Sequence, residues 1–432
     1  MTVPRLALLP NALAVARDQS GHIDVVVRLS APAVESSPSR PAMNLALVID
    51  CSGSMSGRPI QEAKAAARGL VERMQAGDQI CVIGYGAAGA WIAAEPVEAL
   101  QGRGLVLAAI DRLQAAGGTP LRQGWLMGAN ALAPTVSRFG ISQVLLLSDG
   151  QATDGSTPHG LEAEARELAA AGIGTSTYGL GHNFNEDLMT RLASGGGGQA
   201  FFAETADSLL PYFESEFAML AATVGKKIAV TLRARTAQGK DLAPQRLDTL
   251  ASTGVQPMPS LVAGADSFVA FRVPHDALGD KGALRLEAEV TWESLDGQPH
   301  QERAEVTVPA RVRAKPTEDA WALERLKEVD ASRIQREALE SARRGDWNQA
   351  ENLLRGVQGS AMGNAYISGT ASVLQDAAAT RDLSAFAKQA LYACSTMASR
   401  TVDVGENAAD LDGGRFGLRK ANQGKAAPKA GA

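Results

Sequence analysis

The sequence has few cysteines, few aromatic residues and no long apolar run. Its 432 residues include only Cys51, Cys81 and Cys394, which are too few and too scattered for a disulfide framework and predict a reduced, cytoplasmic setting. Aromatic residues make up 5% of the chain, which leaves little for the stacking of nucleic-acid bases. No apolar run approaches the ~20 residues that span a bilayer, so we predict no membrane segment.

An excess of charge of one sign is also missing. The chain has 42 Lys and Arg residues against 47 Asp and Glu residues, and the net charge of −5 is too near neutral for a nucleic-acid-binding protein. Apolar residues at 45% and charged residues at 21% are typical of a globular protein. An apolar stretch near the N-terminus is interrupted by Pro4 and Pro10 and does not predict a signal peptide.

The pattern of apolar residues divides most of the chain into two interleaved parts. Residues 1–40 contain two strand-like runs, 5–9 and 22–29, joined by a predicted hairpin turn. Between 43 and 222, buried strands alternate with helices, which predicts an α/β domain with a doubly wound, mostly parallel sheet. Residues 225–315 return to alternating, antiparallel strands. We therefore predict an antiparallel β-sandwich, built from the first and last of these segments, into which the α/β domain is inserted.

The C-terminal part is predicted to be helical and then disordered. Residues 316–400 carry helical patterns, with a break near Asp330 and another where Gly345 ends one helix and Asp346 caps the next. No 34-residue repeat occurs, so helical hairpins are a better description than a repeat array. Residues 401–432 are rich in Gly, Ala and Asn, which predicts a disordered tail whose basic residues are solvated.

Three separated segments place oxygen-bearing side chains at one edge of the predicted sheet. A buried strand ends at Asp50, and Ser52 and Ser54 follow in a glycine-containing turn. Thr119 precedes a helix in the motif GGTPL, and Asp149 follows another buried strand in LLLSDG. Ligand sites of open α/β sheets lie outside the carboxyl ends of the strands, where these segments would converge. Carboxylate and hydroxyl oxygens suit a hard cation such as Mg²⁺.

These motifs, in this order, resemble the von Willebrand factor A (VWA) family and its metal ion-dependent adhesion site. The resemblance covers about residues 43–222. It implies a Rossmann-like fold and a divalent cation, usually Mg²⁺, with Mn²⁺ or Ca²⁺ as other candidates. The implied metal site consists of Asp50, Ser52, Ser54, Thr119 and Asp149, the last often acting through water. One coordination position would stay open to an Asp or Glu of a partner protein. The surrounding sandwich and helices resemble bacterial cytosolic members.

Several of these polar residues also have purely structural explanations. Asp50 alone could bond the amides of its own loop, but its convergence with Thr119 and Asp149 favours a metal site. We interpret Asp78 as a capping residue and Asp111 as a surface charge. His182 lies in a loop near the same edge of the sheet and is interpreted as facing solvent. Trp91, Trp125, Trp321 and Trp347 are interpreted as packing residues.

Sequence signatures of an enzyme are missing. Gly84–Gly89 matches G-x-G-x-x-G, but the residues after it predict a strand, whereas dinucleotide binding needs a helix there. The chain has no P-loop, no H-E-x-x-H and no nucleophile elbow, and none of its five histidines is paired with a cysteine. We therefore predict a non-catalytic, Mg²⁺-dependent protein-binding module or scaffold.

Two other functions stay open at this point. The resemblance also allows a non-catalytic subunit of an enzyme assembly, either beside an AAA+ ATPase as in magnesium chelatase or beside kinase–phosphatase pairs of bacterial stress systems. A neighbouring ATPase or kinase gene would favour that alternative. A hydrolase that uses the ion as a Lewis acid is a third possibility, but it lacks a candidate base. The sequence determines neither the partner nor the oligomeric state.

Overall fold

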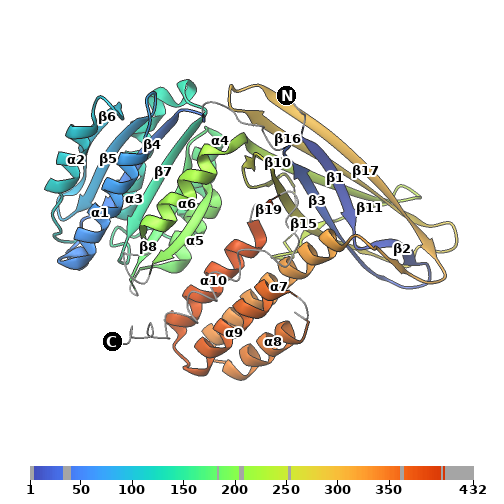
Figure 1. Ribbon diagram of the computed structural model, residues 1–432. Coiled ribbons are helices and arrows are strands. Elements are labelled where there is room, and N and C mark those ends of the chain that lie inside the picture. The colour runs from blue at the N-terminus through green and yellow to red at the C-terminus, as the bar shows by residue number, and fades with distance from the viewer. Residues whose placement is uncertain are drawn as a thin grey trace, which may run out of the picture.

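The computed structural model describes residues 4–32, 40–181, 184–203, 209–251, 254–360, 364–399 and 402–403. Figure 1 shows three parts: an α/β domain in blue to green, a β-sheet part that joins the first strands to the yellow ones, and a helical bundle in orange to red. His182 lies outside the described residues, as does the tail predicted to be disordered, apart from residues 402–403. None of the helices described is both long and apolar enough to cross a membrane.

A six-stranded sheet forms the centre of the α/β domain. Its strands, in spatial order, are β6 (Gly89–Glu98), β5 (Gln79–Gly86), β4 (Met43–Asp50), β7 (Ile141–Ser148), β8 (Gly174–Leu180) and β9 (Gly197–Ala203). All neighbours are parallel except β6, which is antiparallel to β5. Strands β4, β5 and β6 follow one another towards one edge of the sheet, and β7, β8 and β9 follow one another towards the other edge. The topological switch point therefore lies between the carboxyl ends of β4 and β7.

Helices cover both faces of this sheet. One face carries α1 (Arg58–Arg73), α2 (Arg103–Arg112) and α6 (Leu209–Ala221), and the other carries α3 (Leu121–Leu132), α4 (Pro158–Ala170) and α5 (Glu186–Gly195). Two short 3₁₀ turns, η1 (Gly53–Met55) and η2 (Ala133–Arg138), complete the domain. Strands β4 and β7 are buried along their whole length, which is why their sequences are nearly continuous apolar runs. The predicted doubly wound, mostly parallel fold is confirmed.

Two further sheets pack face to face around a second core. The first contains β1 (Arg5–Pro10), β3 (Gly21–Ser30), β15 (Ala265–His275) and β12 (Gln245–Arg246), with β19 (Val402–Asp403) paired to β15. The second contains β11 (Asp241–Leu242), β10 (Thr223–Thr236), β16 (Ala283–Ser294), β17 (Pro299–Arg311), β2 (Ala12–Ala16) and β18 (Lys315–Pro316), with β13 (Gln256–Pro257) and β14 (Leu261–Val262) paired to β10. Apolar side chains from both sheets alternate inward to form this core.

The predicted hairpin between the first two strands is wrong. Strand β2 lies between β1 and β3 in the sequence, and it pairs with β17 and β18 of the other sheet. The chain changes sheets at Asn11, whose main-chain N–H donates to the Asp24 carbonyl and whose Oδ1 accepts from the Asp24 N–H. Strands β1 and β3 are nevertheless antiparallel neighbours. Strand β2 has only five residues, and a run this short shows too little periodicity to be distinguished from a loop.

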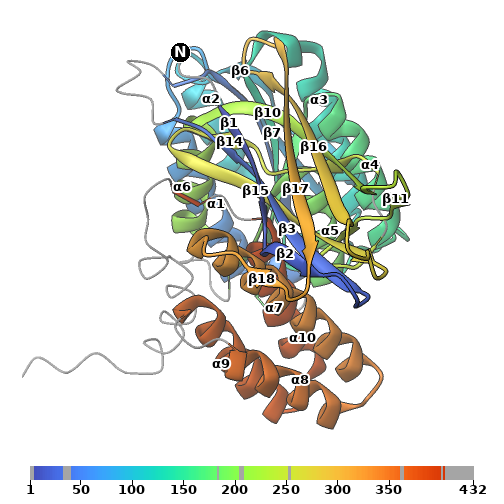
Figure 2. The ribbon, with the colours of Figure 1, turned by 90° about the vertical axis from the view of Figure 1, so that its right-hand side faces the viewer.

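Among the described residues, four helices follow the sheets and gather at one end of the molecule (Figures 1 and 2). They are α7 (Ala320–Arg343), α8 (Trp347–Ser360), α9 (Ala365–Ala379) and α10 (Leu383–Ser399). The expected break near Asp330 does not occur, and the hydroxyl of Ser332 donates instead to the Cys394 carbonyl of α10 at 3.1 Å. Leu326 and Val329 of α7 pack on the outer face of the first sheet.

Candidate metal centre at the switch point

Asp50 is fully buried at the carboxyl end of β4. Its Oδ1 accepts a hydrogen bond from the main-chain N–H of Ser52 at 2.8 Å, and its Oδ2 accepts one from Ser148 Oγ at 2.6 Å. Burial raises the pKa of Asp50, and the hydrogen bonds from Ser148 and Ser52 oppose that rise. The carboxylate is therefore fixed in position by the turn after β4 and by the last residue of β7.

The turn after β4 directs two hydroxyls towards the second carboxylate. Ser52 Oγ and Ser54 Oγ lie 3.0 Å apart, and Ser54 Oγ donates to Asp149 Oδ1 at 2.7 Å. Asp149 follows β7, on the other side of the switch point. Burial raises the pKa of Asp149, the Ser54 hydrogen bond opposes this, and the negative charge of Asp50 adds to the rise. Segments nearly one hundred residues apart thus share one hydrogen-bonded cluster.

Thr119 is held through its main chain, which leaves its hydroxyl for the site. Its N–H donates to Thr153 Oγ1 at 2.9 Å, and its carbonyl accepts from the Thr153 N–H at 2.9 Å. The Thr119 hydroxyl makes no hydrogen bond to any residue within the described ranges. A Cβ placed on Gly150 would lie 3.3 Å from Thr119 Oγ1 and 3.5 Å from Ser54 Oγ. Both hydroxyls therefore border one small space beside Asp149.

Close contact between loop backbones makes this convergence possible. The Gly53 N–H donates to the Gly117 carbonyl at 2.8 Å, which ties the first loop to the second. Gly117 has a φ of +77°, and a Cβ there would lie 2.2 Å from the Cβ of Ala87. A Cβ on Gly86 would lie 2.6 Å from the Cys51 carbonyl oxygen. Only glycine fits at these two positions, because any side chain would push the loops apart.

The residues present fit a hard divalent cation. The structure brings all five predicted site residues together, and every donor atom is a carboxylate or hydroxyl oxygen. In the part of the chain that the structure describes, no basic side chain forms an ion pair with Asp50 or Asp149. That same part contains no group of three or more His, Cys, Asp or Glu side chains arranged to hold a metal. Hydroxyls are therefore essential members of this donor set.

The residues that support the site are not among those predicted from the sequence. Ser148 holds Asp50, and Tyr85, also fully buried, donates its hydroxyl to the Leu147 carbonyl at 3.0 Å. Ser148 could have been found, because it directly precedes Asp149 at the end of a predicted strand. Thr153 gave no signal, since it lies in a polar loop without periodicity. Asp78 has structural partners only, and its carboxylate accepts from the Met43 and Gln75 N–H groups.

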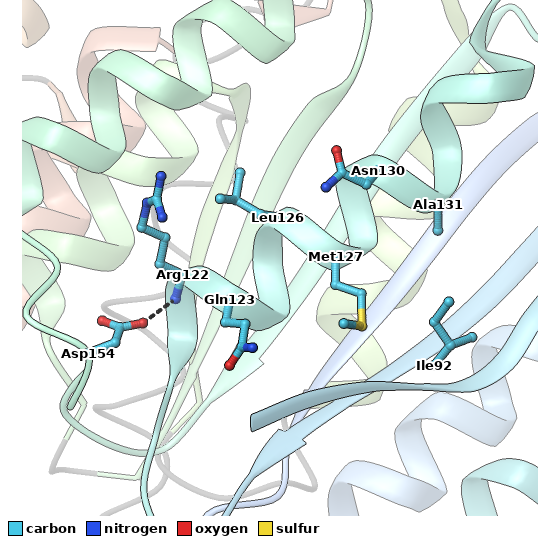
Figure 3. A pocket seen from close by; sticks show the side chains of 8 residues that line it. All are labelled: Ile92, Arg122, Gln123, Leu126, Met127, Asn130, Ala131 and Asp154. Carbon is cyan, nitrogen blue, oxygen red and sulfur yellow. Dashed lines mark hydrogen bonds between the residues drawn. The ribbon is translucent and has the colours of Figure 1, made fainter. Parts of the chain in front are cut away.

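A cavity of about 510 Å³ runs along α3, and none of the five predicted site residues lines it. Figure 3 shows Arg122 and Asp154 at one end of it, joined by a hydrogen bond from the Arg122 N–H to Asp154 Oδ2 at 2.8 Å. Met127 of α3 and Ile92 of β6 line the other end. Helix α3, which lines this cavity, begins two residues after Thr119.

Comparisons with known proteins point to the same region. The family model for the von Willebrand factor type A domain matches residues 44–216. The uncharacterized Synechocystis protein sll0103 is 31% identical over 41% of this chain and 41% of its own length. The uncharacterized Escherichia coli protein YfbK is 30% identical over 44% of this chain and 33% of its own length. The chain thus spans less than half the length of these relatives.

A solved structure extends the likeness beyond this domain. The von Willebrand factor type A protein from Catenulispora acidiphila has a TM-score of 0.60 and 18% identity, with 85% of this chain and 89% of that chain covered. At this identity the likeness concerns the fold alone.

The fold defines an open, doubly wound α/β domain that carries a cluster of carboxylates and hydroxyls at its switch point. The chain contains a von Willebrand factor type A (VWA) domain, matched over residues 44–216, and this domain is inserted between strands of a second, β-sheet part. VWA domains generally mediate protein interactions, and their adhesion site typically holds a divalent metal.

Proposed function

We propose that this protein is a non-catalytic, Mg²⁺-dependent module that binds the Asp or Glu side chain of another protein. The observation that carries the proposal is the convergence of two buried carboxylates and three hydroxyls from three loops at the switch point. Two carboxylates without a basic partner in the described ranges form a site for positive charge. The proposed holders of the ion are Asp50, Ser52, Ser54, Thr119 and Asp149.

The arrangement also supports a binding role rather than catalysis. A bound Mg²⁺ supplies positive charge and a position that a partner carboxylate can fill in place of water. Ser148 and the Ser52 N–H keep Asp50 oriented, and Thr153 keeps Thr119 in place. The surrounding residues contribute hydrogen bonds that fix ligands. The described part of the site contains no histidine, lysine or cysteine positioned as a general base or nucleophile.

Metal binding is tested by calorimetry with Mg²⁺ on the full chain. Asp50→Asn is preferred over Asp50→Ala, because it keeps an acceptor for the Ser52 N–H and preserves packing at a fully buried position. We expect the parent to bind Mg²⁺ and Asp50→Asn to lose that binding. Asp111→Asn, which changes an exposed carboxylate paired with Arg68, is the matched control and should bind like the parent. Equal Mg²⁺ affinity in the parent and Asp50→Asn would reject the site.

Partner binding is tested by capture from native lysate with Mg²⁺ or EDTA. Thr119→Ala should impair capture more than folding, because the Thr119 hydroxyl makes no hydrogen bond within the described ranges while its main chain holds the loop. A captured partner should be lost in EDTA and with Asp50→Asn. It should also be lost when one acidic residue of the partner becomes an amide. Undiminished capture under all these conditions would move the interface to the sheets or the helical bundle.

A further inference from the structure

A second cavity lies at the opposite edge of the six-stranded sheet from the candidate metal centre. Its volume is about 420 Å³. It is bordered on one side by Ile141 and Gly174, the first residues of β7 and β8. On the other side it is bordered by residues of β10 and β13, which belong to the β-sheet part. Asp149 follows the far end of β7, so the length of a whole strand separates the two sites. Both the VWA domain and the β-sheet part contribute to its walls.

The walls of this cavity combine apolar surface with positive charge. Its apolar side chains are aliphatic and include Ile141, Leu220, Ile228, Val255 and Met258. Its charged side chains are Arg166, Lys226 and Lys227. Among the described residues that line it, none is acidic and none is aromatic. A cavity of this size and composition suits a small ligand with an aliphatic body and a negative group.

Lys226 is the cation best placed to hold that negative group. Arg166 pairs with Glu162 and Lys227 pairs with Glu293, at 2.9 Å and 3.1 Å. Lys226 instead donates to the Gly140 main-chain carbonyl at 2.9 Å and has no ion pair within the described ranges. An ammonium group has three donors, so this contact leaves hydrogen-bonding capacity for a ligand.

The environment of Lys226 would favour an arriving anion. Burial lowers the pKa of Lys226, and the positive charge of Lys227 lowers it further, although Glu293 opposes this. A carboxylate beside Lys226 would offset the unfavourable burial of its positive charge. It would also accept a charge-assisted hydrogen bond from the ammonium group, stronger than the present one to the Gly140 carbonyl.

We propose that this cavity binds a small aliphatic carboxylic acid, with Lys226 contacting its carboxylate and Leu220, Val255 and Pro257 packing against its chain. Because the walls come from both the VWA domain and the β-sheet part, the bound acid would also hold these two parts together. The proposal is independent of the metal centre and assigns a second, separate binding site to the chain.

The ligand class is tested with three probes that share an eight-carbon chain: octanoate, octylamine and octanol. Calorimetry and thermal unfolding are measured on the full chain. We expect octanoate to bind and to raise Tm, and the other two probes to bind at least about tenfold more weakly, because only octanoate pairs with Lys226. The proposal is overturned if octanoate does not bind at millimolar concentration, or if octylamine or octanol binds equally well.

Variants locate the binding to this cavity. Lys226→Gln removes the charge, and Val255→Glu adds a negative charge at a side chain that is 68% exposed and so tolerates substitution. Each should weaken octanoate binding about tenfold. Lys64→Gln is the matched control, because Lys64 also donates to a main-chain carbonyl, that of Asp111 at 2.9 Å, but lies outside the cavity. Parent-like octanoate binding by Val255→Glu, or by a Lys226→Gln protein that melts like the parent, would place the binding elsewhere.

Discussion

Ser148 has a larger part in the candidate metal centre than its neutral side chain suggests. Its hydroxyl donates to the buried carboxylate of Asp50 at 2.6 Å and is itself fully buried. A hydrogen bond to a charged acceptor contributes about 1.5–3 kcal/mol to stability, more than a neutral one. Without it, one oxygen of Asp50 would lose its donor in a place that water does not reach.

Ser148→Ala should therefore lower the free energy of unfolding by about 1.5–3 kcal/mol in metal-free buffer, measured by urea denaturation. Ser142→Ala, at the other end of β7, is the control. Ser142 accepts from the amide of Asn44, which has two further acceptors in Leu132 and Thr135, so its loss should cost less. If both variants are equally stable, the Ser148 hydroxyl does not support Asp50.

Only those site residues that directly follow predicted strands could be placed from the sequence. Asp50, Ser52 and Ser54 follow a buried strand at alternate positions, and Asp149 follows another, so their meeting could be predicted from strand ends alone. That they bind a metal stays a prediction. Thr153 and Tyr85 could not be predicted, because their contributions depend on which loops and strands approach one another in three dimensions.

At the scale of elements, α6 carries a buried carboxyl group into the core of the VWA domain. Glu216 is 2% exposed, and its Oε1 accepts from Ser176 Oγ of β8 at 2.6 Å. Burial raises the pKa of Glu216 to about 7, although the Ser176 hydrogen bond opposes this. Its Oε2 has no hydrogen-bond partner within the described ranges. The helix therefore packs best when this group is protonated.

Stability should fall as pH rises from about 4.5 to about 7. In this window the folded protein retains the Glu216 proton and the unfolded chain does not, so the folded state binds more protons and loses stability with increasing pH. Across the whole window the free energy of unfolding should decrease by about 3 kcal/mol because of this group. Glu216→Gln should remove this part of the pH dependence and be more stable than the parent at pH 8, as measured by urea unfolding across the window.

The control for this experiment is Glu214→Gln in the same helix. Glu214 is exposed and pairs with Arg73, so its change should cost at most about 1 kcal/mol and leave the pH dependence like that of the parent. A parent and a Glu216→Gln protein with parallel pH profiles would show that Glu216 does not titrate in this range.

Secondary structure could be predicted where elements are long and periodic. The alternation of strands and helices predicted between residues 43 and 222 is confirmed in the described part of the VWA domain, because each element buries a regular stripe or run of apolar residues. The apolar pattern does not predict β2, which is short, and it predicts a break near Asp330 where α7 is continuous. Ser332 faces α10 instead, and no pattern within one helix reveals the neighbour that accepts its hydrogen bond.

At the scale of the whole molecule, α10 connects the bundle to the VWA domain. The Lys388 ammonium of α10 lies 5.2 Å from the ring centre of Phe184, just before α5. Leu326 and Val329 of α7 contact the first sheet, so the bundle touches both other parts. The bundle thus contacts a domain and a sheet that are far from it in the sequence. Such long-range contacts leave no periodic pattern, so they could not be predicted.

The N-terminal boundary of the VWA domain is a further feature of the whole molecule. Arg40 precedes the predicted boundary at residue 43, yet it donates to Asp78 Oδ1 at 2.8 Å and stacks over Phe217 at 4.8 Å. Asp78 is 1% exposed, and Arg40 is the cation that pairs with its buried carboxylate, beside the N–H groups of Met43 and Gln75. Removing one member of a buried ion pair costs about 3–5 kcal/mol.

A fragment of residues 40–222 should therefore fold alone and be more stable than a fragment of residues 43–222 by about 3–5 kcal/mol, as measured by urea denaturation. Arg40→Met in the longer fragment should reproduce most of that loss. If the two fragments are equally stable, Asp78 does not depend on Arg40.

Residues 225–315 should not fold alone, because β3 lies between β1 and β15 in the first sheet and contributes Ile23, Val25 and Val27 to the second core. Without residues 1–40, β15 loses its neighbour along its whole length, and the inner face of the second sheet is exposed to water. A fragment of 225–315 is expected to show no cooperative thermal transition by circular dichroism. Adding residues 1–40 through a short Gly/Ser linker in place of the VWA domain should restore that transition, since the linker only replaces the inserted domain. A cooperative transition in the fragment alone would mean that the β-sheet part is not divided by the insertion.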